Sequence, residues 1–207
     1  MEEKNQLNQL YPDGIKFLLT GVGGQGTILA SNVLADLGLS LGYDVKKAEI
    51  HGMSQRGGTV TSYIRWAEKV FSPIISKGEA DIIIAFEKLE AIRAIDQLKQ
   101  GGIILVNDYA IVPVTVSSGS AIYPADKEIK EKIHLFTNRD FWVPGMQIAD
   151  ELGNAKVSNV AILGALSQLL GIDKEVFLKV IISKIPEKYR SLNEMSFIRG
   201  RESILEV

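Results

Sequence analysis

The chain has 207 residues, of which 46% are hydrophobic and 23% are charged, and its formal net charge at pH 7 is -2. This length predicts a single domain, because one hydrophobic core can grow to roughly 250 residues. The balanced charge gives no basic surface for nucleic acid, and no apolar run approaches the roughly 18 residues of a membrane span. The polar, acidic opening residues are unlike a secretory signal, so we expect a cytoplasmic protein with no nucleic-acid or membrane partner.

Cysteine is absent from the sequence, and the two histidines are His51 and His134. Iron–sulfur clusters are held by cysteine thiolates, and zinc sites combine several cysteine, histidine or carboxylate ligands. The composition therefore excludes a thiolate-bound cluster, a disulfide and a cysteine nucleophile, and it argues against zinc. We predict no catalytic and no metal-binding residue here, so redox chemistry would need a bound cofactor or a partner.

The start of the chain predicts the opening of an α/β sheet. Residues 1–13 are typical of an irregular lead-in that ends in a turn, and residues 14–207 are expected to form one domain. Residues 17–19 predict a short buried strand. Apolar side chains then recur at helical spacing over residues 27–41, and residues 44–50 predict a second strand. This strand–turn–helix–strand order is that of a doubly wound sheet.

The next segment departs from a plain dinucleotide-binding unit. Residues 59–66 alternate between polar and apolar side chains, which is typical of a half-solvated strand. Residues 70–75 are predicted to return against this strand as a hairpin, with Pro73 at a strand edge or end.

An α/β alternation resumes further along the chain. The β-branched run at residues 81–86 predicts a central parallel strand, followed by a helix over 87–100 and a strand at 103–106. A short charged helix is expected over residues 126–133.

The C-terminal third, from about residue 146, has a helical pattern, in which the small apolar residues 159–166 favour close helix packing. Together the elements predict an α/β fold: a doubly wound, Rossmann-like, mostly parallel sheet with a hairpin insertion and a helical C-terminal part.

A glycine-rich motif, Gly-Val-Gly-Gly-Gln-Gly at residues 21–26, separates the first strand from the first helix. Glycines at this spacing permit a tight turn and let the first N–H groups of the helix face an anion. Glu49 stands where a ribose-binding acid is expected in such a unit. The alternative is that the glycines only let strand and helix pack closely. The motif alone does not decide between ligand binding and close packing.

A second motif, His-Gly-Met-Ser-Gln-Arg-Gly-Gly at residues 51–58, follows the second strand. Its arginine offers a planar fork of donors that suits carboxylate or phosphate, and open α/β sheets bind ligands at the carboxyl ends of their strands. A glycine turn with a surface arginine is the alternative. From both motifs we predict a set of cofactor-contacting residues: Gly21, Gly23, Gly24, Gln25, Gly26, Ser54, Gln55, Arg56, Gly57 and Gly58.

The two motifs together resemble the gamma domain of the 2-oxoacid:ferredoxin oxidoreductases, and within that family its indolepyruvate branch. The resemblance continues through residues 81–87, 101–102, 106–108 and 159–164, so it covers nearly the whole chain after Pro12. It implies a subunit rather than a self-sufficient enzyme.

In this family, thiamine diphosphate, magnesium and the iron–sulfur clusters belong to other domains, which a larger alpha subunit would carry here. The absence of cysteine, and of any recognisable thiamine diphosphate motif, agrees with that division. The resemblance implies that the complex oxidatively decarboxylates an aryl 2-oxoacid with coenzyme A and reduces ferredoxin. This chain would bind no cofactor tightly. Its glycine loops would contact coenzyme A or only the partner, and the isolated chain could form a homodimer.

The alternative function is a free-standing dinucleotide-binding protein for NAD(P) or a flavin, which the first glycine motif and Glu49 favour. Among the remaining polar residues, Glu87 could point into the crevice at the strand ends, but we favour a helix-start acid. The same two alternatives apply to Asn107 and Asp108, for which we favour a loop role. The aromatic and basic residues 139–144 fit either a protein interface or a core-facing loop.

Overall fold

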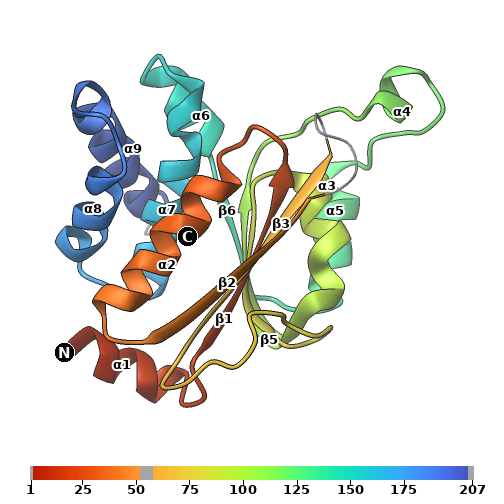
Figure 1. Ribbon diagram of the computed structural model, residues 1–207. Helices are drawn as coiled ribbons and strands as arrows, with labels where there is room; N and C mark the ends of the chain where they lie inside the picture. The colour runs from red at the N-terminus through yellow and green to blue at the C-terminus, as the bar shows by residue number, and fades with distance from the viewer. Residues whose placement is uncertain (1, 52–57, 205–207) are drawn as a thin grey trace.

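The computed structural model describes residues 2–51 and 58–204, which form a sheet with helices on both of its faces (Figure 1). The sheet has six strands in the order β2-β3-β1-β4-β5-β6. The strands are β1 (Ile15–Val22), β2 (Asp44–His51), β3 (Thr59–Ala67), β4 (Ala80–Ala85), β5 (Leu98–Asn107) and β6 (Asp140–Val143).

Strands β1, β4, β5 and β6 pair in parallel, whereas β3 is antiparallel to both of its neighbours, β1 and β2. Since β2 is antiparallel to β3, it runs in the same direction as β1. The predicted α/β, mostly parallel sheet is therefore confirmed, with β3 as its antiparallel member.

The helices cover both faces of the sheet, as Figure 1 shows. One face carries α2 (Thr27–Ser40) and most of the C-terminal helices, and the other carries α3 (Lys88–Ala94) and α5 (Asp126–His134). The C-terminal helices are α6 (Gly145–Glu151), α7 (Ser158–Leu169), α8 (Lys174–Ser183) and α9 (Arg190–Glu202). The predicted helical C-terminal part is thus present.

The central strands place alternate side chains into two separate cores. In β1, Phe17 and Leu19 pack with the α2 face, while Leu18 between them packs with the α3 and α5 face. In β4, Ile82 packs with the α2 face and Ile83 with the α3 and α5 face. Because successive side chains of a strand point to opposite faces, a strand covered on both sides must be apolar throughout.

The hairpin prediction was correct for β3 and wrong for its partner. Residues 70–75 form no strand, and β3 instead pairs along its length with β1 on one edge and with β2 on the other. Both edges of β3 are therefore occupied, which leaves no backbone groups for a further strand. The Val70 N–H donates instead to the Asp44 carboxylate at 2.9 Å.

The boundaries at three other places differ from those predicted. The expected lead-in contains helix α1 (Glu2–Leu10), which buries Leu7 in the core. The helix expected to reach residue 100 ends as α3 at Ala94, and β5 already begins at Leu98. Residues 140–143 form the edge strand β6 rather than a loop.

Helices α7 and α9 cross with their backbones in contact, as the small residues 159–166 predicted. A Cβ atom at Gly200 of α9 would lie 1.9 Å from the carbonyl oxygen of Ala161 in α7. Only glycine leaves room for this approach, and it fixes α9 against the helix that borders the site described below.

The helices seen in residues 2–51 and 58–204 include none with the length and apolar character needed to cross a membrane.

Candidate functional site

The first glycine motif forms the turn between β1 and α2, at the carboxyl end of the parallel strands. Within it, the Gln25 side chain accepts a hydrogen bond from the Val22 N–H (2.7 Å) and donates one to the Phe86 carbonyl (2.8 Å). Since Phe86 directly follows β4, this side chain joins the ends of two neighbouring strands. The Gln25 amide therefore has a structural role in shaping the loop.

Gly26 is the residue of this loop that brings a distant helix to the site. It caps α2 in the left-handed region, with φ of 81° and no side-chain cap. A Cβ atom there would lie 2.0 Å from Nδ2 of Asn159, near the start of α7. Backbone conformation and close approach both require glycine, and the result places Asn159 against the N-terminus of α2.

The structure brings the two glycine motifs together at one point. The Gly23 N–H donates a hydrogen bond to the Gly58 carbonyl at 3.0 Å. The rest of the second predicted set lies outside the described residues, namely Ser54, Gln55, Arg56 and Gly57. Their contact with a cofactor stays a prediction.

A crevice of about 530 Å³ opens beside the first glycine loop. One wall is the loop itself, residues 23–26, and the other walls come from the end of β5 and from the segment that joins α6 to α7. Its lining also contains Leu29, Asn107, Tyr109, Ile111, Met146, Ala155, Lys156, Ser158 and Asn159. The crevice thus lies at the carboxyl ends of the strands, where open α/β sheets bind ligands.

Two asparagines in this crevice have amide oxygens without a hydrogen-bond partner. Asn107 is 2% exposed and Asn159 is 3% exposed, and Oδ1 of each is unpaired within the part of the chain that the structure describes. The Asn107 amide nitrogen, in contrast, donates to the Phe86 carbonyl at 3.2 Å. Buried polar atoms are almost always paired, so these two oxygens point to donors supplied by water, a ligand or a partner.

The electrostatics of the crevice favour an anionic group at its α2 end. Helix α2 has 14 residues, and its N-cap residue Gly26 supplies no side-chain cap, so its first N–H groups and the positive end of its dipole are available there. The exposed Lys156 adds a positive side chain to the lining. The combination suits a ligand that carries both phosphate and hydrogen-bond donors.

Glu49 does not take the place expected of a ribose-binding acid. In a dinucleotide-binding unit the second strand lies next to the first, but here β3 lies between β2 and β1. Glu49 is therefore two strand spacings, roughly 10 Å, from the β1 position. Its carboxylate pairs with Lys47 Nζ at 2.7 Å and accepts a hydrogen bond from the Ser31 hydroxyl at 3.2 Å.

Glu87 is the helix-start acid that the sequence predicted. It is the N-cap of α3, and its Oε2 accepts a hydrogen bond from the Glu90 N–H at 2.9 Å. Its other oxygen accepts from the Tyr123 hydroxyl. Burial, and then this bond to a carboxylate, raises the pKa of the Tyr123 hydroxyl well above its usual range. The hydroxyl therefore stays protonated as a donor.

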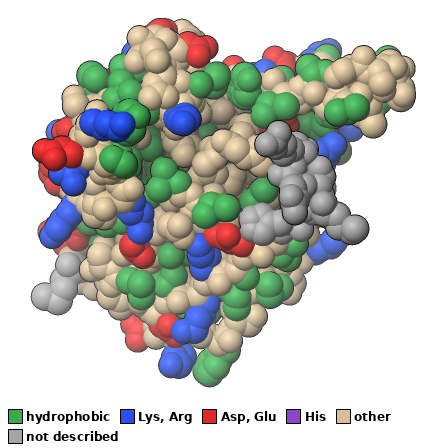
Figure 2. All heavy atoms as spheres, turned by 45° about the horizontal axis from the view of Figure 1, so that its top comes forward, with side chains coloured by type: hydrophobic (Ala, Val, Ile, Leu, Met, Phe, Trp, Pro, Cys, Tyr) green, Lys and Arg blue, Asp and Glu red, His purple; other side chains and the backbone are tan. Residues whose placement is uncertain are grey.

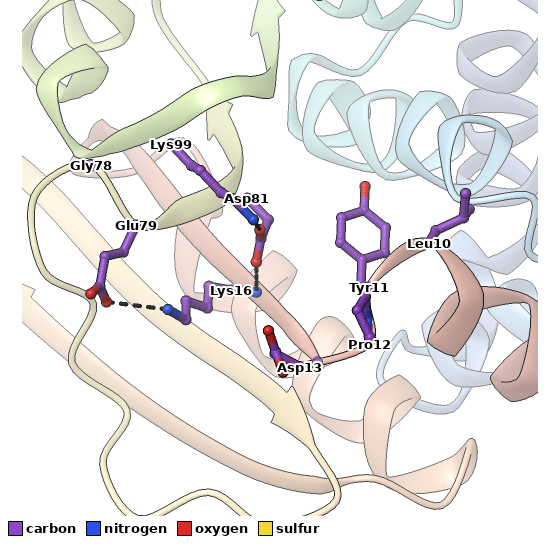
Figure 3. A pocket seen from close by; sticks show the side chains of 10 residues that line it. Leu10, Tyr11, Pro12, Asp13, Lys16, Gly78, Glu79, Asp81 and Lys99 are labelled. Carbon is purple, nitrogen blue, oxygen red and sulfur yellow. Dashed lines mark hydrogen bonds and ion pairs between the residues drawn. The ribbon is translucent and has the colours of Figure 1, made fainter.

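A second cavity, of about 230 Å³, lies at the opposite ends of β1 and β4 (Figure 3). Four of its five charged side chains form two pairs, Lys16 Nζ with Glu79 at 3.2 Å and Lys99 Nζ with Asp81 at 3.3 Å, and the fifth is Asp13. The other Asp81 oxygen accepts from the Lys16 N–H at 3.0 Å. Because both lysines that line this cavity are already paired with carboxylates, the crevice is the stronger candidate site for an anionic ligand.

The sequence identified the glycine loop and left open a place for Asn107 in the crevice, but it did not identify the other lining residues. Asn107 follows a predicted strand and Asn159 interrupts an apolar helix, and a polar residue in such a position is the signal that could have marked them. Tyr109, Met146 and Lys156 give no such signal. Among the described residues, no group of three or more histidines or carboxylates is placed to hold a metal ion.

Residues 16–203 match the family model of the pyruvate ferredoxin/flavodoxin oxidoreductases. The chain is 39% identical to the indolepyruvate oxidoreductase subunit IorB of Thermococcus kodakarensis, across 92% of this chain and 96% of that one. The gamma subunit of a keto/oxoacid ferredoxin oxidoreductase from Geobacter sulfurreducens has a similar structure, with a TM-score of 0.68 and 23% identity over 93% of this chain and 99% of that one.

A third relative shows the same fold within a longer chain. The 2-oxoglutarate:ferredoxin oxidoreductase of Magnetococcus marinus, solved with 2-oxoglutarate, coenzyme A and succinyl-CoA bound, matches with a TM-score of 0.70 and 20% identity. The match covers 94% of this chain but 32% of that one. From the family model and the identity to IorB, the chain belongs to the pyruvate ferredoxin/flavodoxin oxidoreductase family, as the resemblance of its two glycine motifs predicted.

Proposed function

We propose that this chain is the small subunit of a 2-oxoacid:ferredoxin oxidoreductase that acts on an aryl 2-oxoacid of the indolepyruvate type. The identity to IorB, which extends over nearly the full length of both chains, is the observation that carries this proposal. The complex would release the carboxyl group of the 2-oxoacid as CO2, transfer the acyl group to coenzyme A and pass two electrons to ferredoxin.

The redox cofactors of this complex belong, in our proposal, to a larger alpha subunit. That subunit would hold thiamine diphosphate with magnesium and the iron–sulfur clusters, and it would be the one that meets ferredoxin. The absence of cysteine from this chain supports the division, because clusters need thiolate ligands. Coenzyme A is a substrate of the cell interior, so the proposal carries a cytoplasmic location.

The role we propose for the crevice is a contact with coenzyme A. Its phosphates suit the uncapped N-terminus of α2 beside Gly26 and Lys156. Its pantetheine part carries amide N–H groups, which suit the unpaired oxygens of Asn107 and Asn159. The alkyl portions of that arm suit the apolar lining. A contact of this kind would be completed by the partner subunit, and the chain alone would hold the ligand weakly.

The alternative, a free-standing dinucleotide-binding protein, fits the structure less well. In the observed strand order β3 separates Glu49 on β2 from the strand that leads into the glycine loop, and the Glu49 carboxylate forms an ion pair with Lys47. A calorimetric titration of the isolated chain with NAD, NADP and flavins tests the point. We expect no binding, and tight binding of any of them would contradict the subunit assignment.

The coenzyme A contact is tested by steady-state kinetics of the reconstituted complex. Replacing Asn159 with alanine removes a hydrogen-bond acceptor and should raise the KM for coenzyme A about threefold to tenfold, with kcat little changed. Arg56→Ala tests the second motif in the same assay. Lys99→Ala, in the cavity at the opposite end of the sheet, is the matched control. If Asn159→Ala and Arg56→Ala leave both the KM for coenzyme A and assembly unchanged, the contact is refuted.

A further inference from the structure

Residues 110–122, which we call the arm, extend away from the body of the protein between β5 and α5 (Figure 1). The arm carries the short helix α4 (Val114–Ser117), seen at the upper right of Figure 1. Across the described residues, the hydrogen bonds made by residues 112–122 all close within the arm itself. The outer part of the arm is thus not held against the sheet or its covering helices by hydrogen bonds.

The composition of the arm is that of an interface rather than of a solvated loop. Residues 109–125 contain no charged side chain, although 23% of the whole chain is charged. Three apolar side chains are open to solvent: Val112 is 54% exposed, Val114 is 82% exposed and Ile122 is 93% exposed. Figure 2 shows the projecting arm at the upper right, with hydrophobic and uncharged atoms along its outer part. Depletion of charge with exposure of apolar groups marks the core of a protein–protein interface.

The first residue that anchors the arm is Lys88, at the start of α3. Lys88 is 8% exposed. Its Nζ pairs with Asp108 at 2.6 Å, before the arm, and with Asp126 at 2.9 Å, after it. Burial lowers the pKa of the Lys88 ammonium, but the hydrogen bonds to the two aspartates outweigh it and the pKa is raised overall. One charged side chain therefore holds both ends of the arm.

The second residue that anchors the arm is Glu87, which is 1% exposed. Its Oε1 accepts hydrogen bonds from the Ile111 N–H (3.0 Å) and from the Tyr123 hydroxyl, again one contact at each end of the arm. The arm is thus anchored at its base by two buried residues and projects as a preformed element. Preformed elements lose less conformational entropy on binding than free loops do, which makes them effective at docking.

We propose that the arm docks into an apolar groove of the larger subunit of the complex, an inference that rests on the proposed function. In the Magnetococcus marinus enzyme the matching region is 32% of the chain, so the same fold is joined there to a much larger body. Tyr109 and Ile111, at the base of the arm, line the crevice. A partner that holds the arm would therefore stand over the crevice and complete the site there.

A second copy of this chain is a less suitable occupant. A twofold contact uses the same surface on both copies, so each copy would have to offer a groove for the arm of the other. The crevice of about 530 Å³ beside the glycine loop, lined in part by Leu29, Ile111 and Met146, is one such groove. Filling it with an arm would close the site proposed for coenzyme A.

The experiment measures binding of this chain to the immobilised large subunit of its own complex. The arm variant is Val114→Asp/Ile122→Asp, which places two charges on the apolar surface. The matched control is Phe71→Asp, because Phe71 is 90% exposed and lies outside the arm. We expect the arm variant to bind at least about tenfold more weakly than the wild type, and the control to bind within about twofold of it. Equal binding of arm variant and wild type would overturn the proposal.

Hydrogen exchange on the unaltered chain gives a second readout that needs no variant. Amides of residues 112–122 should exchange more slowly in the complex than in the isolated chain, and unchanged exchange there would count against docking of the arm. If the wild type itself does not bind the large subunit, the proposed function fails together with the arm. If sedimentation shows a wild-type dimer that the arm variant dissociates, the occupant is a second copy and our proposal is overturned.

Discussion

The contact between Gly26 and Asn159 provides a quantitative test of how the crevice is built. Replacing Gly26 with alanine places a Cβ atom where the structure leaves 2.0 Å to Asn159 Nδ2, in a residue with φ of 81°. Two separate costs follow. The left-handed backbone costs an alanine about 1–2 kcal/mol, and the overlap with the amide costs about 1–3 kcal/mol.

A second substitution separates these two costs. In an Asn159→Ala background the amide is gone, and the Cβ of residue 159 lies 3.5 Å from the new methyl group at position 26, an ordinary contact. Only the backbone cost of about 1–2 kcal/mol should remain. Gly26→Ala is therefore expected to destabilise the wild type by about 2–5 kcal/mol and the Asn159→Ala variant by clearly less, with a coupling free energy of about 1–3 kcal/mol.

Urea unfolding of the four proteins in this double-mutant cycle measures the coupling. The midpoint should fall with little change in the slope of unfolding free energy against urea, since the folded surface is the same in each. Asn159→Ala alone should cost little, because the hydrogen bond from its Nδ2 to the Gly26 carbonyl is long, 3.5 Å, and its Oδ1 is unpaired. If Gly26→Ala costs the same in both backgrounds, Asn159 does not lie against the glycine loop and does not form a wall of the crevice.

Three further predictions concern stability. Gly200→Ala should destabilise the chain by about 3 kcal/mol or more, because its Cβ would lie 1.9 Å from a backbone oxygen of α7, and a thermal midpoint equal to that of the wild type would contradict the crossing. Tyr123→Phe removes a donor from the buried Glu87 carboxylate and should cost about 1–3 kcal/mol in urea unfolding; a neutral result would show that water replaces the hydroxyl. The Val70 N–H and Lys46 lower the pKa of the Asp44 carboxyl because they interact with its ionised form. The stability that these contacts contribute is therefore fully present above the unfolded-state pKa near 4 and is lost as pH falls through the lower folded-state pKa. Asp44→Asn should therefore flatten the fall of the urea midpoint below about pH 4, and an unchanged pH profile would refute this.

The parts of the fold that depend on local pattern were predictable from the sequence. The continuous apolar run of β4 and the helical spacing of α2 each specify one element, and the small residues of α7 specify close packing. The place of β3 between β2 and β1 was not predictable, because strand order depends on pairing between distant segments. The helix at residues 2–10 was missed because a polar segment with a single buried leucine carries little periodic signal.

The difference between local pattern and contacts of distant segments also determines which parts of the site could be predicted. The glycine loop is a continuous motif with a defined backbone use, so residues 21–26 could be read directly. The crevice also needs Asn107 and Asn159, which come from different elements and meet only because β5 and α7 lie beside the loop. The arm carries no motif at all. The proposal that the arm is an interface rests on the exposure of Val114 and Ile122, which cannot be predicted from the sequence alone.

The most direct test of the subunit assignment is reconstitution from separately purified chains. The measurement is the rate of ferredoxin reduction with indolepyruvate and coenzyme A, for each chain alone and for their mixture. We expect negligible reduction by this chain alone, reduced or absent activity of the large subunit alone, and full activity that saturates at a fixed ratio of the two. A large subunit that is fully active without this chain, and gains nothing on mixing, would contradict it.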